Sequence, residues 1–191
     1  MGKPEPQIRA LQSQSLLRAV RTLAPAERNE ILARAGPATI EILESAFPVA
    51  WNSMALHMHL SDIVRDVLGP ERNVGIWRTT MAWSLERPLF KGFVRMTAEL
   101  FGVSPISFLR QGERIYEHLT KGLGTLKSRG ESNRGFIELR QFPADRYQFI
   151  CYVEGLAGCI KATVELAHVP YTLTIRDMDE KKGNVSYWIA W

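Results

Sequence analysis

The side chains in this sequence that could bind a metal ion are two histidines and two methionines close together. His57 and His59 lie beside Met54 and Met58, a mixture of nitrogen and sulfur donors that suits a soft metal. Residues two apart on a helix point about 200° apart, so the two histidines do not reach one ion from a regular helix. The two methionines share a face, but such pairs usually fill a core. We therefore expect no metal site.

The two cysteines offer a second kind of chemistry. Cys151 and Cys159 lie on one predicted helix, about 12 Å apart along its axis at a rise of 1.5 Å per residue, which is too far for a disulfide. They could flank a pocket, although free cysteines more often serve as small buried hydrophobic side chains. Free thiols without an export signal favour a cytoplasmic location.

Catalytic signatures are missing from the sequence. Acid–base catalysis needs carboxylates or histidines that converge in a cleft, and the spacing of the acids and histidines gives them no shared geometry. The chain has no Gly-x-Ser-x-Gly elbow, no phosphate-binding loop and no Cys-x-x-Cys pair. We expect a protein that is not an enzyme.

Aromatic side chains on adjacent predicted helices, together with small residues of a later helix, indicate a ligand site. They could line an apolar cavity, the usual form of a small-molecule site. Ordinary core packing is the commoner explanation of such a set. The candidate ligand-binding residues are Trp77, Trp83, Phe90, Phe93, Cys151, Gly155 and Cys159.

A mildly basic stretch supplies a different candidate surface. The net charge is +4, and residues 105–146 hold eight Lys or Arg against five acids. A basic stripe can bind nucleic acid or another polyanion. A solvated helix face with Glu–Arg pairs is the favoured interpretation, because no base-stacking aromatics alternate with the charges. The candidate polyanion-binding residues are Arg110, Arg114, Lys121 and Lys127.

The elements that must position these residues are helical over most of the chain. Apolar side chains recur at spacings of three and four, which is the period of a helix. Gly-Pro, Arg-Pro and Ser-Pro pairs separate one predicted helix from the next. Trp51 is expected to plug the core below a corner at Phe47-Pro48. The sequence predicts helices at 8–23, 25–35, 38–46, 53–68, 71–85, 89–101 and from 105 to as far as 128, followed by a polar loop at 128–134.

The last third of the chain changes its period. Residues 135–142 alternate apolar and polar side chains, 147–168 follow a helical period, and 171–176 and 185–191 alternate again. Gly155 and Gly158 lie inside that helix, where each costs roughly 1 kcal/mol against alanine, so we expect a close approach to a sheet or another helix. This is a closing βαββ unit.

These elements predict an α+β fold in which N-terminal helices pack on a small antiparallel sheet. Residues 1–46 form a helical N-terminal extension, and residues 47–191 form an α+β domain with the βαββ unit at 135–191. The helices should cover one face of the sheet, which leaves the other for a dimer surface or a pocket wall. No apolar run reaches the roughly 18 residues of a membrane span.

Two resemblances follow from these patterns. Residues 151–161, 169–176 and 185–191 resemble the C-terminal part of a superfamily that contains vinyl-reductase-like ligand-binding domains, haem-nitric-oxide-binding domains and TRAPP vesicle-tethering subunits. That resemblance implies a glycine-containing helix packed on an antiparallel sheet. Upstream, Phe47-Pro48 with Trp51, the helix around 78–82 and residues 112–124 are similar to a myxobacterial paralogous family of uncharacterised proteins, which has no known activity.

The sequence departs from the ligand patterns of these families. Haem-binding members use an axial histidine and a Tyr-x-Ser-x-Arg motif, and this chain lacks the motif. Vinyl-reductase-like members carry clustered cysteines near the final hairpin, and none lie there. In TRAPP relatives a cysteine-lined apolar tunnel holds an acyl chain, but the match does not identify Cys151 or Cys159 as that cysteine. We therefore expect no cofactor.

The sequence favours a non-catalytic, cytoplasmic sensory or adaptor domain that binds a small hydrophobic ligand or a signalling partner. One alternative is a homodimeric interaction module with a filled core. Another is a weak binder of polyanions through the basic stripe at 110–146. The ligand hypothesis comes from the resemblance of the βαββ unit, which is an analogy from fold.

Overall fold

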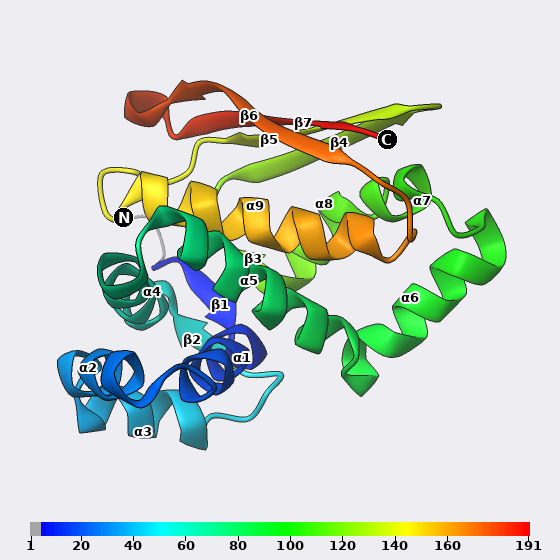
Figure 1. Ribbon diagram of the computed structural model, residues 1–191. Helices are drawn as coiled ribbons and strands as arrows, with labels where there is room; N and C mark the ends of the chain where they lie inside the picture. The colour runs from blue at the N-terminus through cyan, green and yellow to red at the C-terminus, as the bar shows by residue number, and fades with distance from the viewer. Residues whose placement is uncertain (1–4) are drawn as a thin grey trace.

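The computed structural model describes residues 5–191, except for the side chains of Leu89 and Phe93. Its helices and strands form an α+β fold in layers (Figure 1). A four-stranded antiparallel sheet forms the outer layer, and the long helix α9 (Phe149–Glu165) lies along its inner face. The N-terminal helices lie on the far side of α9. The predicted fold class is confirmed.

The N-terminal helices begin and end close to where the sequence predicts them. Four of them start with a proline at the first helical position, where its missing N–H has no partner to lose. Gly36, Gly69 and Gly102 follow helices with positive φ, which non-glycine residues rarely adopt. The helices are α1 (Ala10–Arg21), α2 (Pro25–Ala35), α3 (Pro37–Ser45), α4 (Met54–Leu68), α5 (Pro70–Leu85) and α6 (Pro88–Phe101).

A small second sheet lies beneath these helices, and the sequence did not predict it. Strand β1 (Gln7–Arg9) pairs antiparallel with β2 (Trp51–Ser53) on one side and β3 (Thr120–Lys121) on the other. The prediction of helix from residue 8 was therefore wrong over its first two residues. Strands of two or three residues carry no usable period, and their hydrogen bonds join positions far apart in the chain.

The expectation that Trp51 plugs the core was also wrong. Trp51 is only half-buried, and two cations lie over its ring. The guanidinium carbon of Arg9 is 3.8 Å from the ring centroid, and Nζ of Lys121 is 4.2 Å from it. The indole ring therefore ties the outer strands to β1 by cation–π contacts at the surface.

The region after residue 105 differs most from the prediction. In place of one long helix there are two short ones, α7 (Pro105–Leu109) and α8 (Gly112–Leu119), followed by β4 (Thr125–Glu131). Gly122 and Gly124 have φ of 69° and 82°, so the backbone turns left-handed where the helix was expected to continue. The predicted loop at 128–134 is wrong as well, because β4 and β5 (Arg134–Arg140) form a hairpin across it.

The main sheet has the strand order β4-β5-β7-β6. β6 (Thr172–Asp179) and β7 (Asn184–Ala190) are joined by a short turn in which Gly183 is left-handed. The βαββ unit predicted at 135–191 is thus present, extended at one edge by β4. Alternate residues of β5 and β7, including Leu139 and Tyr187, are buried against α9 as the period of two predicts.

The two helices α9 and α5 approach each other closely at glycines. A Cβ on Gly158 would lie 2.5 Å from the carbonyl oxygen of Val74 and 2.8 Å from the backbone nitrogen of Arg78. A Cβ on Gly155 would lie 3.1 Å from the indole nitrogen of Trp77. The predicted close approach is confirmed, and its partner is the helix α5.

The first 46 residues are integrated with the rest of the structure. β1 is the central strand of the small sheet, and α1 packs along α5. The division of the chain at residue 46 stays a prediction. Among residues 5–191, no helix is both long enough and apolar enough to cross a membrane.

Candidate ligand cavity

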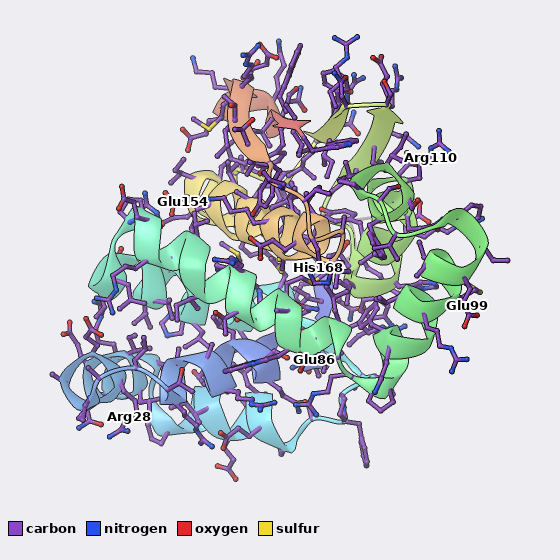
Figure 2. The ribbon with its side chains drawn as sticks, turned by 45° about the vertical axis from the view of Figure 1, so that its right-hand side comes forward. Arg28, Glu86, Glu99, Arg110, Glu154 and His168 are labelled. Atoms are coloured by element: carbon purple, nitrogen blue, oxygen red, sulfur yellow. The ribbon has the colours of Figure 1, made fainter. Side chains whose placement is uncertain are left out.

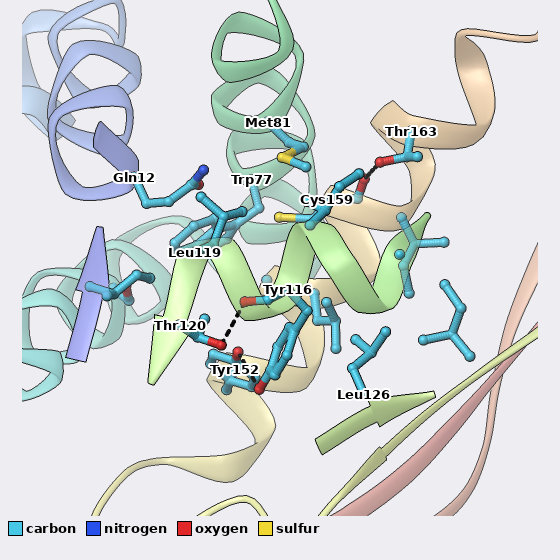
Figure 3. Close-up of a pocket in the computed structure, with 18 of the residues that line it drawn as sticks. Gln12, Trp77, Met81, Tyr116, Leu119, Thr120, Leu126, Tyr152, Cys159 and Thr163 are labelled. Atoms are coloured by element: carbon cyan, nitrogen blue, oxygen red, sulfur yellow. Dashed lines mark hydrogen bonds between the residues drawn. The ribbon is translucent and has the colours of Figure 1, made fainter. Parts of the chain in front are cut away.

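A cavity of about 100 Å³ lies in the middle of the molecule. It is bounded by α9 and α5, by α8 and by the first turn of α1, with the main sheet on the opposite side (Figure 3). The elements that bound it come from the whole length of the chain. The residues that line it are Ile8, Gln12, His57, Met58, Ser61, Trp77, Met81, Phe108, Leu109, Gly112, Ile115, Tyr116, Leu119, Thr120, Leu126, Ile137, Cys151, Tyr152, Gly155, Leu156, Cys159, Ile160 and Thr163.

The lining is predominantly apolar and carries no formal charge. No aspartate, glutamate, lysine or arginine is among the described residues that bound the cavity. An ionised ligand would lose its hydration there without gaining a counter-ion, which costs far more than its apolar contacts return. The cavity therefore suits a neutral molecule.

Three hydroxyl or ring groups of the lining are bonded to the protein itself. Ser61 Oγ donates to the carbonyl oxygen of His57 at 2.8 Å, and Thr163 Oγ1 donates to that of Cys159 at 2.9 Å. His57 Nδ1 lies 2.9 Å from Ser13 Oγ. These side chains are therefore already satisfied and do not require a ligand.

A chain of tyrosines closes the side of the cavity next to α8. Tyr152 OH donates to Tyr116 OH at 3.1 Å, and Tyr116 OH donates to the carbonyl oxygen of Leu123 at 2.8 Å. Thr120 Oγ1 donates to the carbonyl oxygen of Tyr116 at 2.9 Å. Burial raises the pKa of both phenols above the ordinary value. They stay neutral at physiological pH and serve as hydrogen-bonded walls.

His57 is a neutral member of the wall. Its side chain is 1% exposed, and its ring stands edge-on to Trp77 with the centroids 5.2 Å apart. Desolvation lowers the pKa of His57 to about 3. The imidazole is therefore uncharged at neutral pH, because no acid lies close enough to offset the cost of burying its cation.

Two N–H groups of the lining have no hydrogen-bond partner in the described structure. They are Nε2 of Gln12 and Nε1 of Trp77. The two residues are 3% and 7% exposed, so solvent does not satisfy these donors. Figure 3 shows Gln12 extending from α1 towards Trp77 and Leu119. Buried N–H groups without a partner are uncommon in native proteins and call for an explanation.

The cysteines line the cavity but are unsuited to nucleophilic chemistry. Both are free thiols, and both belong to the lining. Burial raises the pKa of the Cys159 thiol to about 12. Burial, with a further contribution from Asp62, raises the pKa of Cys151 beyond that of an ordinary thiol. Since the thiolate is the reactive form, both cysteines act as small apolar side chains at neutral pH.

Four of the seven predicted ligand-binding residues meet at this cavity. They are Trp77, Cys151, Gly155 and Cys159. The other three predicted residues are not among the described residues that line it. Trp83 is half-buried beneath Arg18, and the side chain of Phe93 lies outside the described part of the structure. Phe90 is buried in a cluster that includes Met81 and Leu119 of the lining, but it does not bound the cavity itself.

The lining residues that sequence reasoning missed lie mainly on α8, α9 and α4, and α1 adds Gln12. Those of α8, Tyr116 among them, were assigned to a longer helix, so their contact with the cavity was not foreseeable. Gln12 did leave a signal, because it lies four residues from Ile8 and from Leu16, on an otherwise apolar stripe. A lone polar side chain at a core position is a candidate for a functional contact.

The predicted polyanion-binding residues are spread over several elements. Arg110 and Arg114 are exposed near α7 and α8, whereas Lys121 lies on β3 over the ring of Trp51. Lys127 on β4 is bonded to Glu113 at 2.9 Å. Polyanion binding by these residues stays a prediction.

Acidic side chains of α9 are engaged in ion pairs and do not line the cavity. One of these acids, Glu154, is labelled in Figure 2. Arg65 donates two hydrogen bonds to Glu154, at 2.8 and 2.9 Å, and Asn73 Nδ2 donates to the same carboxylate at 2.9 Å. Arg78 donates to Glu165 at 2.7 Å. These pairs join α4 and α5 to α9. Within residues 5–191, no group of three or more His, Cys, Asp or Glu is placed to hold a metal ion.

Comparison with known proteins shows the fold. No protein-family model and no curated protein sequence matches this chain. Solved structures of H-NOX proteins match it over nearly its whole length. The structure of a mutant T. tengcongensis H-NOX has a TM-score of 0.64 at 12% identity, with 96% of this chain and 97% of that chain covered. The chain has an H-NOX-like fold.

Two further structures agree with that conclusion. A Cs H-NOX mutant that carries the unnatural amino acid 4-cyano-L-phenylalanine matches with a TM-score of 0.66 at 12% identity and covers 96% of each chain. An oxygen-binding H-NOX domain related to soluble guanylate cyclases, solved as an oxygen complex, matches with a TM-score of 0.58 at 13% identity, over 93% of this chain and 91% of that chain. The resemblance noted for residues 151–191 thus extends over almost the entire fold.

The residues of this cavity do not fit haem. The propionates of a porphyrin need cations that the described lining lacks. His57 is the one histidine of that lining, and its ring is held between Ser13 and Trp77. The fold is shared with haem proteins, but the wall of this cavity is not built for that cofactor.

Proposed function

We propose that this chain is a non-catalytic sensory domain that binds a small, neutral, largely apolar molecule in the central cavity. The observation that carries the proposal is the cavity of about 100 Å³ with an uncharged lining. Among the matching H-NOX structures, one concerns haem distortion and another is the oxygen complex of an oxygen-binding domain. The shared fold supports a ligand role here, whereas the lining favours a different ligand.

The size of the cavity limits the ligand. Apolar cavities of roughly 150 Å³ in other proteins stay dry and bind benzene or xenon. A cavity of about 100 Å³ is of the same order, so a ligand with a body of about five or six heavy atoms is the expected class. Burying such a body yields about 25 cal/mol for each Å² of apolar surface removed from water.

The first test uses benzene as a probe and Cys159 as the point of change. The sulfur of Cys159 lies at the cavity wall (Figure 3). Cys159→Met should fill part of the space and weaken benzene binding about fivefold or more, since even one lost methylene-sized contact is worth ~1 kcal/mol. Cys159→Ser, which keeps the size of the side chain, is the matched control and should bind benzene nearly as the wild type does.

Isothermal calorimetry and ligand-observed NMR would measure these affinities. Native mass spectrometry of freshly purified protein would add the identity of any molecule that copurifies. Absence of benzene binding, or equal binding by Cys159→Met and the wild type, would refute the proposal. Protein expressed with a supply of haem is expected to purify without the visible absorbance of haem.

A second candidate, an interaction module, is favoured by exposed apolar side chains around the end of α6. Leu100, Phe101 and Val103 are 67%, 59% and 58% exposed. Patches of this kind often mark contact surfaces. Sedimentation analysis at micromolar concentration tests the homodimer, and a monomer at all concentrations would exclude it.

A further inference from the structure

Two polar groups in the cavity wall indicate what kind of ligand the cavity binds. Gln12 lies in the first turn of α1, and Trp77 lies in the middle of α5. Both residues line the cavity, and both are more than nine-tenths buried. Their side-chain N–H groups have no hydrogen-bond partner within the described structure.

These two donors differ from every other polar side chain of the lining. The hydroxyl groups of Ser61, Thr120 and Thr163, the two phenols and the ring of His57 all have protein partners. Leaving a buried donor unpaired costs roughly 1–3 kcal/mol. The protein supplies partners for the other polar side chains of the cavity wall but no acceptor for these two donors. A ligand that brings an acceptor into the cavity would remove this cost.

Water molecules are poor partners for these two donors. A single water needs roughly 10–15 Å³ and two to four polar partners. The cavity of about 100 Å³ holds room for several waters, which would share two donors and otherwise meet apolar side chains. A ligand with an apolar body and one polar end uses both parts of the wall.

We propose that the ligand of this cavity is a small neutral molecule whose carbonyl-type oxygen accepts hydrogen bonds from Gln12 Nε2 and Trp77 Nε1. An indole nitrogen donates and never accepts, so the ligand group opposite Trp77 must be an acceptor. The absence of lysine and arginine from the described lining excludes a carboxylate as that acceptor. This inference rests on the proposed function and specifies its ligand class.

A matched pair of probes distinguishes a purely apolar cavity from a cavity that offers two hydrogen-bond donors. Cyclopentanone and methylenecyclopentane have nearly the same shape and differ in whether the exocyclic atom is an oxygen or a CH₂ group. In a purely apolar cavity the hydrocarbon binds tighter, by about tenfold or more, because the ketone gives up its bonds to water. With Gln12 and Trp77 as donors, cyclopentanone is expected to bind at least as tightly as methylenecyclopentane.

Two variants and one control assign the effect to these residues. Gln12→Met and Trp77→Phe each remove one donor and keep most of the apolar volume, so each should weaken cyclopentanone about tenfold while methylenecyclopentane changes little. Trp83→Phe is the control, because Trp83 lies beneath Arg18 and is not among the residues that line the cavity. That control should keep the wild-type ratio of the two affinities.

NMR of the wild-type protein gives a readout that does not depend on any variant folding. The indole N–H resonance of Trp77 should move downfield when cyclopentanone binds and should stay close to its free position with methylenecyclopentane. Sequential assignment of the wild-type spectrum identifies the Trp77 resonance, and Gln12→Met carries the affinity test if Trp77→Phe is unfolded.

The possible outcomes are distinct. If neither probe binds, the proposed function fails and this inference fails with it. A second outcome is that methylenecyclopentane binds, that cyclopentanone binds at least about tenfold more weakly, and that the Trp77 resonance does not move. This outcome would refute the inference that the ligand carries an acceptor, but it would leave the proposed ligand-binding function intact. Tighter binding of the ketone, lost in Gln12→Met, supports the inference.

Discussion

The contact between α5 and α9 makes a sharp prediction about Gly158. Replacing Gly158 by alanine adds a single methyl group inside a helix. In isolation that change favours the helix by about 1 kcal/mol. Here the new Cβ would lie 2.5 Å from the carbonyl oxygen of Val74, 2.7 Å from Cβ of Trp77 and 2.8 Å from the nitrogen of Arg78.

Those neighbours are backbone or backbone-proximal atoms of α5, so no side chain can rotate to relieve the overlap. Separating the two helices would loosen the most extensive contact between elements of the described structure. Overpacking of a core costs typically about 1–3 kcal/mol and sometimes more. With the gain in helix propensity subtracted from the upper part of that range, Gly158→Ala should lower the free energy of unfolding by about 2 kcal/mol.

Two other glycines provide a graded comparison. Gly75 lies on the solvent side of α5, where a Cβ would meet nothing within 4 Å, so Gly75→Ala should stabilise the protein by about 1 kcal/mol. Gly155→Ala meets Trp77 at 3.1 Å and should fall between the other two variants.

Equilibrium unfolding in urea measures all three variants, and the midpoints should follow that order with little change in the slope. If Gly158→Ala is as stable as Gly75→Ala, the close approach of the helices does not exist as described and the reasoning is refuted.

Two further predictions concern buried polar groups. The pKa of His57 falls from 6.5 to about 3 on folding, so the unfolded state binds the extra proton and stability is lost as the pH falls below about 6.5; the loss should approach ~1.4 kcal/mol per pH unit. His57→Gln should flatten this slope in acid unfolding curves, the exposed control His59→Gln should keep it, and a slope that survives in His57→Gln would exclude His57 as its source. Arg65→Ala leaves the carboxylate of Glu154, 7% exposed, without its bidentate partner, so the midpoint of thermal or urea unfolding should shift by the equivalent of about 3 kcal/mol. The exposed pair of Arg95 with Glu99 is the control, and Arg95→Ala should have little effect; equal effects of the two substitutions would contradict the buried role of Arg65.

Local periodicity predicted the long elements of this protein correctly. The helices from α1 to α6, α9 and the strands β5, β6 and β7 follow from apolar spacing, prolines and glycines that act within a few residues. The close packing of α9 was also predicted, because glycines inside a helix cost free energy and are expected where a neighbouring element leaves no room for a Cβ atom. The signals failed for the short elements β1, β3 and α8, and also for β4, which was predicted as the end of a helix and a loop.

The candidate site was predicted in part for the same reason. Trp77, Cys151, Gly155 and Cys159 lie on two long helices whose existence was predicted, and all four line the cavity. Trp83 lies beneath Arg18, and Phe90 packs in a cluster with lining residues such as Met81, but neither residue bounds the cavity itself. Adjacency in sequence does not specify in which direction a helix is rotated against its partners.

The amino-acid sequence by itself thus determined the fold class, the long helices and the helix face that meets α5, since these depend on interactions between neighbouring residues. Only the tertiary structure decided where the cavity lies and which donors remain unpaired in it. Gln12 lies on α1 and Trp77 on α5, and the sequence near either residue does not show that both line the same cavity. An unsatisfied hydrogen bond is a property of the whole packed molecule, because every part of the chain has the opportunity to supply the missing acceptor.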